Sequence, residues 1–177
     1  NSTLKPQQLV LDPHSQWSTV IATGSDGKRL AVFAIRSKGF YGPWTPTEIA
    51  TLGSATANYT VESSIGFLRR VYVGLHRPAS FTHKSSLYLV NSGSGGTWSG
   101  AFPLPHSGPT DNNLLIAKNT FTDHLHAVFT RHSGHHPGVM AEMQPSGGGW
   151  TKPASFSTSR TDRAIALCTD CNGRYVY

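Results

Sequence analysis

The sequence predicts an all-β fold, and three observations support this prediction. Charged residues make up only 14% of the 177 residues, whereas glycines number 18 and prolines 11. Valine, isoleucine, threonine and aromatic residues recur in short bursts between glycine-rich and proline-rich stretches, a pattern typical of short strands joined by tight turns. No segment keeps a helical periodicity over several turns. We therefore expect antiparallel strands and little helix.

The length and the terminal sequences predict one domain, residues 1–177, of a soluble protein. The chain has no apolar run long enough to span a membrane, and "NSTLKPQQLV" has neither a basic leader nor an apolar segment, so any signal peptide would already be removed. Asn1 in "NST" and Asn58 in "NYT" match the acceptor pattern for N-glycosylation. Both sequons favour a secreted, extracellular glycoprotein.

The two cysteines, Cys168 and Cys171, stand in "CTDCNG", which the flanking residues place in a hairpin. A redox or zinc role is disfavoured, because no strand-to-helix junction and no second cysteine pair accompany the motif. We expect a local disulfide, with free thiols as the alternative. No cofactor is expected.

Tryptophans that follow glycine-rich turns mark an internal repeat. Trp44, Trp98 and Trp150 recur at intervals of roughly fifty residues. The stretches before them are "LAVFAIRSKGFYGPW", "SSLYLVNSGSGGTW" and "GVMAEMQPSGGGW". A second landmark, Ile-Ala followed by a polar turn and a strand ending in Val-aromatic, occurs in "IATGSDGKRLAVF", "IAKNTFTDHLHAVF" and "IALCTDCNGRYVY", with a weaker copy in "TVESSIGFLRRVY".

Repeats of this length predict a β-propeller, because a single small meander cannot bury both of its faces and neighbouring blades must stack. The expected blades cover residues 19–59, 60–113 and 114–162, with a last blade formed by 163–177 plus 1–18. Such a four-bladed ring would be closed by the two ends of the chain. The alternatives are a part of a larger propeller or a homo-oligomeric one.

Two blade sequences resemble known lectins. "SDGKRLAVFAI" and "LHAVFT" with "MQPSGGGWTKP" are similar to the blade signature of propeller lectins of the tachylectin-2 and bacterial seven-bladed type. "GGGWTKPASFSTSRTDRAIALCTDCNGRYVY" also resembles the generic sialidase-like repeat. The middle blade departs from the lectin signature, since it lacks the Asp-Gly turn and carries the insert "HRPASFTHKS". The lectin resemblance implies sugar binding in shallow pockets between blades, without catalysis.

The tryptophans after the glycine turns have two alternative roles. Each indole could fill the core between blades, or it could offer an exposed face to the C–H groups of a sugar ring. The candidate carbohydrate-binding residues are Trp44, Trp98, Trp150, Tyr41 and Gln144.

The histidine-rich stretch "DHLHAVFTRHSGHHPG" is a weak metal candidate. His124, His126 and His132 could contribute imidazole ligands, with His135 and His136 nearby. Their spacing matches no standard zinc module, so a solvated strand and loop is favoured and no metal is expected.

Enzymatic motifs are scarce. The chain has no Gly-x-Ser-x-Gly elbow, phosphate-binding glycine loop or His-Glu-x-x-His, and Arg69 and Arg70 with Glu62 are the only concentrated candidates for a sialidase-like site. Adjacent arginines on a strand point to opposite faces. We predict a lectin without catalytic activity; a protein-interaction propeller and a sialidase-like glycoside hydrolase are the alternatives.

The net charge of +6 and the pI near 9.6 predict non-specific attraction to anionic glycans. The basic residues are dispersed, so no specific nucleic-acid site is expected. The expected partners are glycans or glycoproteins.

Overall fold

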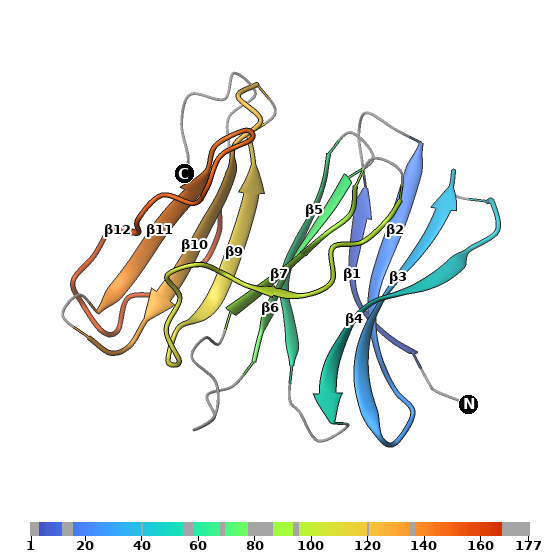
Figure 1. Cartoon of the computed structure of the whole chain (residues 1–177), viewed down its shortest axis with the longest axis horizontal. Coiled ribbons are helices and arrows are strands. Elements are labelled where there is room, and N and C mark those ends of the chain that lie inside the picture. The colour runs from blue at the N-terminus through green and yellow to red at the C-terminus, as the bar shows by residue number, and fades with distance from the viewer. Residues whose placement is uncertain are drawn as a thin grey trace.

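The protein is an all-β molecule. The computed structural model describes residues 4–11, 16–39, 41–54, 59–67, 70–77, 87–93, 96–119, 121–134 and 137–167. Over these residues the chain forms twelve strands, which pair into three four-stranded antiparallel sheets (Figure 1). The prediction of an all-β fold built from antiparallel sheets is confirmed.

Each sheet is a meander whose strands pair in chain order. The first sheet contains β1 (Leu4–Leu11), β2 (Trp17–Ser25), β3 (Arg29–Lys38) and β4 (Thr45–Ser54). The second contains β5 (Thr60–Phe67), β6 (Arg70–His76), β7 (Leu87–Asn91) and β8 (Phe102–Pro103). The third contains β9 (Asn112–Lys118), β10 (Leu125–Arg131), β11 (Gly138–Gln144) and β12 (Ala154–Ser155).

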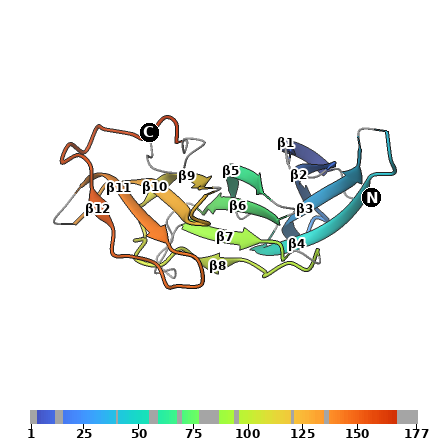
Figure 2. The same ribbon diagram turned by 90° about the horizontal axis from the view of Figure 1, so that it is seen from above.

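The three sheets stand side by side, with the second between the first and the third (Figures 1 and 2). Their first strands are neighbours, since β5 contacts both β1 and β9. A row of sheets that meet along their first strands is a propeller-like arrangement. The fold class expected from the repeat is therefore present in this coarse form.

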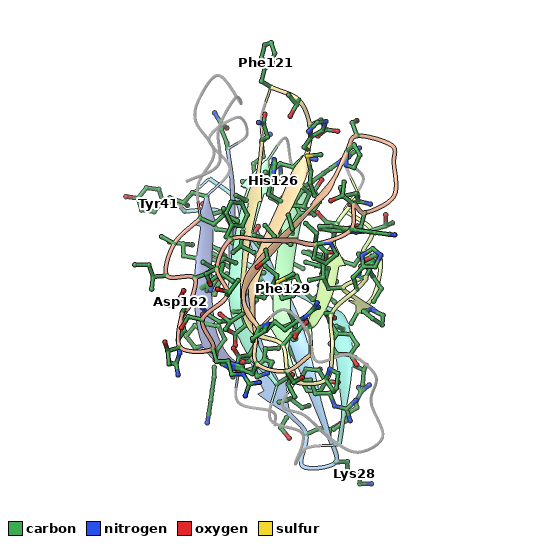
Figure 3. The ribbon with its side chains drawn as sticks, turned by 90° about the vertical axis from the view of Figure 1, so that its left-hand side faces the viewer. Lys28, Tyr41, Phe121, His126, Phe129 and Asp162 are labelled. Atoms are coloured by element: carbon green, nitrogen blue, oxygen red, sulfur yellow. The ribbon has the colours of Figure 1, made fainter. Side chains whose placement is uncertain are left out.

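The middle sheet is buried on both faces, which divides the core into two clusters. Along β6, Val73 and Leu75 pack into the cluster shared with the first sheet, whereas Tyr72 turns to the cluster shared with the third. This alternation follows from the period of two along a strand. Phe129 on β10 is fully buried in the second cluster and lies inside the body of the molecule (Figure 3).

The sheets are offset from the blade boundaries expected from the sequence. Residues 4–11 form the first strand of the first sheet and pair with β2, instead of joining residues 163–177 in a last blade. The connection between β1 and β2 is short, and short connections favour antiparallel pairing of consecutive strands. Residues 163–167 form no strand, and residues 168–177 lie outside the described part of the chain.

The glycine turns before the tryptophans have the same place in all three sheets. Trp44, Trp98 and Trp150 each lie between the third and the fourth strand of their sheet. Gly96 and Gly147 in two of these turns have φ angles of 83° and 69°. Backbones with such angles favour glycine, which explains why glycine runs precede the tryptophans.

Gly138 at the start of β11 also needs to be a glycine. Its φ is 128°, and an added Cβ would collide with the carbonyl oxygen of Ser157. Gly134 also has a positive φ, 101°, but open space surrounds it. We expect Gly138→Ala to lower the free energy of unfolding by about 2 kcal/mol more than the matched control Gly134→Ala, in chemical denaturation. Equal losses in the two variants would contradict the packing seen here.

Several sequence predictions fall on residues that the structure does not describe. They concern the sequons at Asn1 and Asn58, the cysteine pair Cys168 and Cys171, and the side chains of Arg69, His135 and His136. In the described part of the chain no helix has the length and hydrophobicity to cross a membrane.

Candidate functional site

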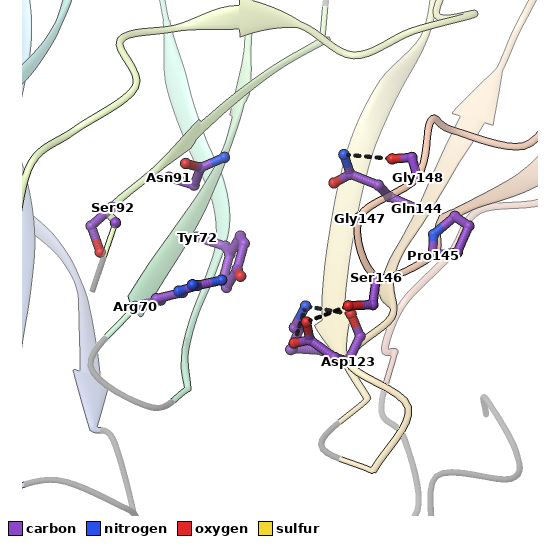
Figure 4. A pocket seen from close by; sticks show the side chains of 12 residues that line it. Arg70, Tyr72, Asn91, Ser92, Asp123, Gln144, Pro145, Ser146, Gly147 and Gly148 are labelled. Carbon is purple, nitrogen blue, oxygen red and sulfur yellow. Dashed lines mark hydrogen bonds and ion pairs between the residues drawn. The ribbon is translucent and has the colours of Figure 1, made fainter. Parts of the chain in front are cut away.

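A polar pocket of about 550 Å³ opens between the second and the third sheet (Figure 4). Strands β6 and β7 with the residues that follow them form one wall, and the ends of β9 and β11 with their turns form the other. The lining residues are Arg70, Tyr72, Asn91, Ser92, Gly93, Lys118, Asp123, Gln144, Pro145, Ser146, Gly147 and Gly148. Amides, hydroxyls and charged groups thus dominate the wall.

Strand register brings the residues of the third sheet together. Leu125 on β10 is paired with Lys118 on β9 and with Gln144 on β11. Residues that are paired directly across antiparallel strands project from the same face. Lys118 and Gln144 therefore share the face that packs toward the second sheet, where Leu125 belongs to the second core cluster.

The turn from β9 to β10 positions Asp123. The side-chain oxygen of Asn119 accepts hydrogen bonds from the backbone N–H groups of Phe121 (3.0 Å) and Thr122 (2.9 Å). Asp123 itself takes a φ of 58°, in the left-handed region that aspartate tolerates better than most residues. The turn leaves Phe121 exposed at its tip (Figure 3) and directs Asp123 to the pocket wall.

Lys118 and Asp123 form the electrostatic centre of this wall. The Nζ of Lys118 lies 2.7 Å from the Asp123 carboxylate and donates a 2.6 Å hydrogen bond to the Asp123 backbone oxygen. The hydroxyl of Ser146 donates to the other carboxylate oxygen at 3.0 Å (Figure 4). The hydrogen bond from Lys118 holds the pKa of Asp123 below its usual value, with Ser146 acting in the same direction. Asp123 is thus ionised at neutral pH.

The turn after β11 forms the rim of the pocket. Gly148 donates its N–H to the carbonyl oxygen of Pro145 at 3.0 Å, and Gly147 has a φ of 69°. The Gln144 amide donates a 3.4 Å hydrogen bond to the backbone oxygen of Gly148. The remaining donor and acceptor capacity of this amide faces the pocket.

A buried acid lies behind this wall. Glu142 is two residues from Gln144 on the same face of β11, is 3% exposed, and contacts Nδ1 of His106 at 3.1 Å. Burial raises the pKa of Glu142 to about 7, although the hydrogen bond from His106 opposes this shift. Arg131, which is ion-paired with Asp111 at 2.8 Å, donates a 2.6 Å hydrogen bond to the backbone oxygen of His106 and so supports the histidine.

The sequence-predicted binding residues are spread over the molecule. Gln144 lines the pocket, whereas Trp98 and Trp150 are half-buried and pack against the first and the second core cluster. Trp44 is 39% exposed, and Tyr41 is fully exposed and points away from the sheets (Figure 3). The structure does not bring these five residues together, and their roles in binding sugar stay predictions.

The candidate histidines and Glu62 lie apart from the pocket. The rings of His124 and His126 have centroids 6.4 Å apart, and His132 hydrogen-bonds the side chain of Asn112 at 3.2 Å. No three His, Cys, Asp or Glu side chains in the described ranges gather as a metal site. Glu62 on β5 lies 3.6 Å from His76, and Arg70 lines the pocket without it.

Sequence reasoning missed Lys118, Asp123, Asn91 and Ser146. A signal for Asp123 was present, because its turn occupies the position of the polar turn in the repeat. The comparable Asp26 between β2 and β3 caps its own turn by accepting hydrogen bonds from the N–H groups of Lys28 and Arg29 at 2.9 and 2.8 Å. Asp123 does not cap its own turn in this way, so its carboxylate can face the pocket.

Comparisons with known proteins identify a structural neighbour. No family model and no curated protein sequence matches the chain. The α-L-arabinofuranosidase of Podospora anserina, solved in complex with cellotriose, superimposes with a TM-score of 0.51 over 94% of this chain at 11% identity. The likeness is one of fold. The chain spans 55% of the length of that enzyme.

This neighbour corrects the prediction that the chain is not an enzyme. That prediction followed from the lectin resemblance and from the scarcity of catalytic motifs. The fold found here is similar to that of an α-L-arabinofuranosidase, so the fold gives no ground for excluding catalysis. The resemblance to tachylectin-type propellers finds no support from a family model.

Proposed function

We propose that the chain is a carbohydrate-active protein that holds a sugar in the pocket between the second and the third sheet. The observation that carries this proposal is the polar pocket of about 550 Å³ itself. A sugar presents many hydroxyls at fixed angles, and recognition requires donors and acceptors that are already in place. The wall supplies the amides of Asn91 and Gln144, the hydroxyl of Ser146 and the carboxylate of Asp123.

The fixed geometry of these groups favours binding. Asp123 is held by Lys118 and Ser146, and Gln144 is held by the turn at Gly148, so few side chains would lose freedom when a sugar is bound. Asn91 and Gln144 lie at the ends of strands β7 and β11, and preorganised sites on such rigid elements bind more tightly than mobile ones. The site resembles the inter-blade pocket expected from the sequence in its position between two sheets.

Titration calorimetry with neutral oligosaccharides, starting with cellotriose, tests the binding. We expect Gln144→Ala and Asn91→Ala each to weaken the affinity about 10-fold, because each removes hydrogen bonds to sugar hydroxyls. The matched control is Gln16→Ala, which removes an exposed amide just before β2 and should bind like the wild type. The same loss in all three variants, or none in any, would contradict the assignment of the pocket.

Glycoside hydrolysis is the second candidate, and the structural neighbour favours it. Hydrolysis of this kind uses one ionised carboxylate and one carboxyl that can donate a proton. Asp123 has a lowered pKa, whereas the pKa of Glu142 is raised to about 7, so the two acids would differ in protonation near neutral pH. Asp123 lines the pocket, whereas Glu142 does not line it and shares the face of β11 that carries Gln144.

A chromogenic α-L-arabinofuranoside, followed by a panel of other glycosides, tests the reaction. If the pocket hydrolyses glycosides, Asp123→Asn should lower kcat by about 100-fold or more, the contribution of a positioned acid or base. The melting temperature is measured alongside, because Asp123 also neutralises the buried Lys118. Unchanged turnover in a folded Asp123→Asn variant would exclude this pocket as the place of the reaction.

A further inference from the structure

The charges of the pocket are not balanced. Arg70 and Lys118 bring two positive charges, and Asp123 is the single acid among the lining residues. Lys118 is 6% exposed and is bound at 2.7 Å to Asp123, so this pair neutralises itself. The positive charge of Arg70 is therefore not balanced by an acid among the lining residues.

Arg70 is exposed at the start of β6, and its side chain reaches along the wall opposite Asp123 (Figure 4). Its charge acts across the pocket, since it contributes to lowering the pKa of Asp123. No hydrogen bond, ion pair or ring contact with another described residue engages its guanidinium. Other arginines differ: Arg29 is bound to Asp26, Arg131 is bound to Asp111, and Arg36 lies over the ring of Trp17.

We infer that the pocket selects an acidic sugar, in which Arg70 binds the carboxylate of a hexuronic acid residue. This inference rests on the proposed carbohydrate-binding function. A guanidinium offers a planar fork of N–H donors that matches a carboxylate in a bidentate manner, and a neutral sugar leaves that fork unused. The amides of Gln144 and Asn91 then bind the ring hydroxyls of the same glycan.

Asp123 does not cancel this preference. Its carboxylate is engaged by Lys118 and Ser146, whereas an acidic ligand would approach the wall that carries Arg70. The site therefore separates a neutralised ion pair on the third sheet from a positive group on the second. Such a separation orients a glycan with its acidic substituent toward β6 and its neutral hydroxyls toward β11.

A matched pair of ligands tests the inference: cellotriose, and the same trisaccharide with C6 of its terminal ring oxidised to a carboxylate. Calorimetry at physiological salt should show that the wild type binds the acid about 10-fold more tightly than cellotriose, because the acid adds a charge-assisted hydrogen bond. Arg70→Gln should abolish this preference and leave the affinity for cellotriose within about twofold, because the hydroxyl contacts remain. Arg70→Lys should keep only part of the preference, because lysine lacks the planar fork.

Arg160→Gln is the control for net charge, since Arg160 is exposed in the 159–163 loop and does not line the pocket. It should retain the wild-type preference. If the wild type binds both trisaccharides equally, or if Arg160→Gln loses the preference as Arg70→Gln does, the acidic-sugar inference is overturned while carbohydrate binding stands. If a C6-sulfated trisaccharide alone shows the Arg70-dependent gain, the carboxylate assignment is overturned. If neither cellotriose nor its acid binds, the proposed function fails and this inference fails with it.

Discussion

Replacing Trp98 or Trp150 by alanine is expected to lower the free energy of unfolding by about 2–4 kcal/mol, because each indole contributes to an inter-sheet core and its removal leaves a cavity. Trp98 packs against the cluster between the first and second sheets, and Trp150 against the cluster between the second and third. Trp44→Ala should cost far less, since Trp44 is 39% exposed and belongs to neither cluster.

Thermal and chemical denaturation of the three variants check this expectation, and glycan binding is measured on the same samples. A stable Trp98→Ala or Trp150→Ala protein would contradict the packing role. Loss of binding in a stable Trp44→Ala protein would instead support the prediction that its indole contacts sugar. These paired measurements decide between the two alternatives that the sequence left open for the tryptophans.

Glu142→Gln is expected to remove a pH-dependent component of stability of about 3 kcal/mol. Burial raises the pKa of Glu142 to about 7, so the folded protein holds a proton that the unfolded chain releases near its ordinary value of 4.5. The resulting stabilisation is fully present below pH 4.5 and is lost as the pH rises through about 7. The glutamine variant, which cannot ionise, should therefore gain stability relative to the wild type between these values.

Urea denaturation at intervals from pH 4.5 to 8.5 measures this difference, and subtraction of the two curves cancels the titration of groups that do not contact Glu142. The variant Asp162→Asn removes an exposed carboxylate, and its curve of stability against pH should run parallel to that of the wild type. Parallel curves for Glu142→Gln as well would show that Glu142 is ionised at the same pH in the folded and unfolded states.

The sequence predicted the individual strands and turns better than their grouping into sheets. Glycine turns followed by tryptophan marked the link from third to fourth strand in every sheet, because that turn needs positive φ angles. In the second and third sheets the following indole also packs against an adjacent core. The repeated "AVF" led to wrong blade boundaries. It lies on the third strand of the first sheet at Val32 and on the second strand of the third sheet at Val128, so it shifted the first expected blade by one strand.

The site was predictable only in part. Gln144 could be named because it precedes a recognisable turn within its own strand segment. The ion pair of Lys118 with Asp123 depends on an irregular turn, and the approach of Arg70 depends on how two sheets pack. Contacts of this second kind join residues that are distant in sequence and carry no local pattern, so a single sequence does not reveal them.

The most direct test of the central claim, that the pocket between the second and third sheets binds carbohydrate, is to locate a bound sugar by nuclear magnetic resonance. In a titration with cellotriose followed by ¹⁵N–¹H correlation spectra, we expect the largest shifts at the side-chain amides of Gln144 and Asn91 and at the backbone amides of Gly147 and Gly148. The indole N–H of Trp44 should stay in place. Saturable shifts confined to Trp44 and its neighbours, with the pocket amides unmoved, would contradict the account.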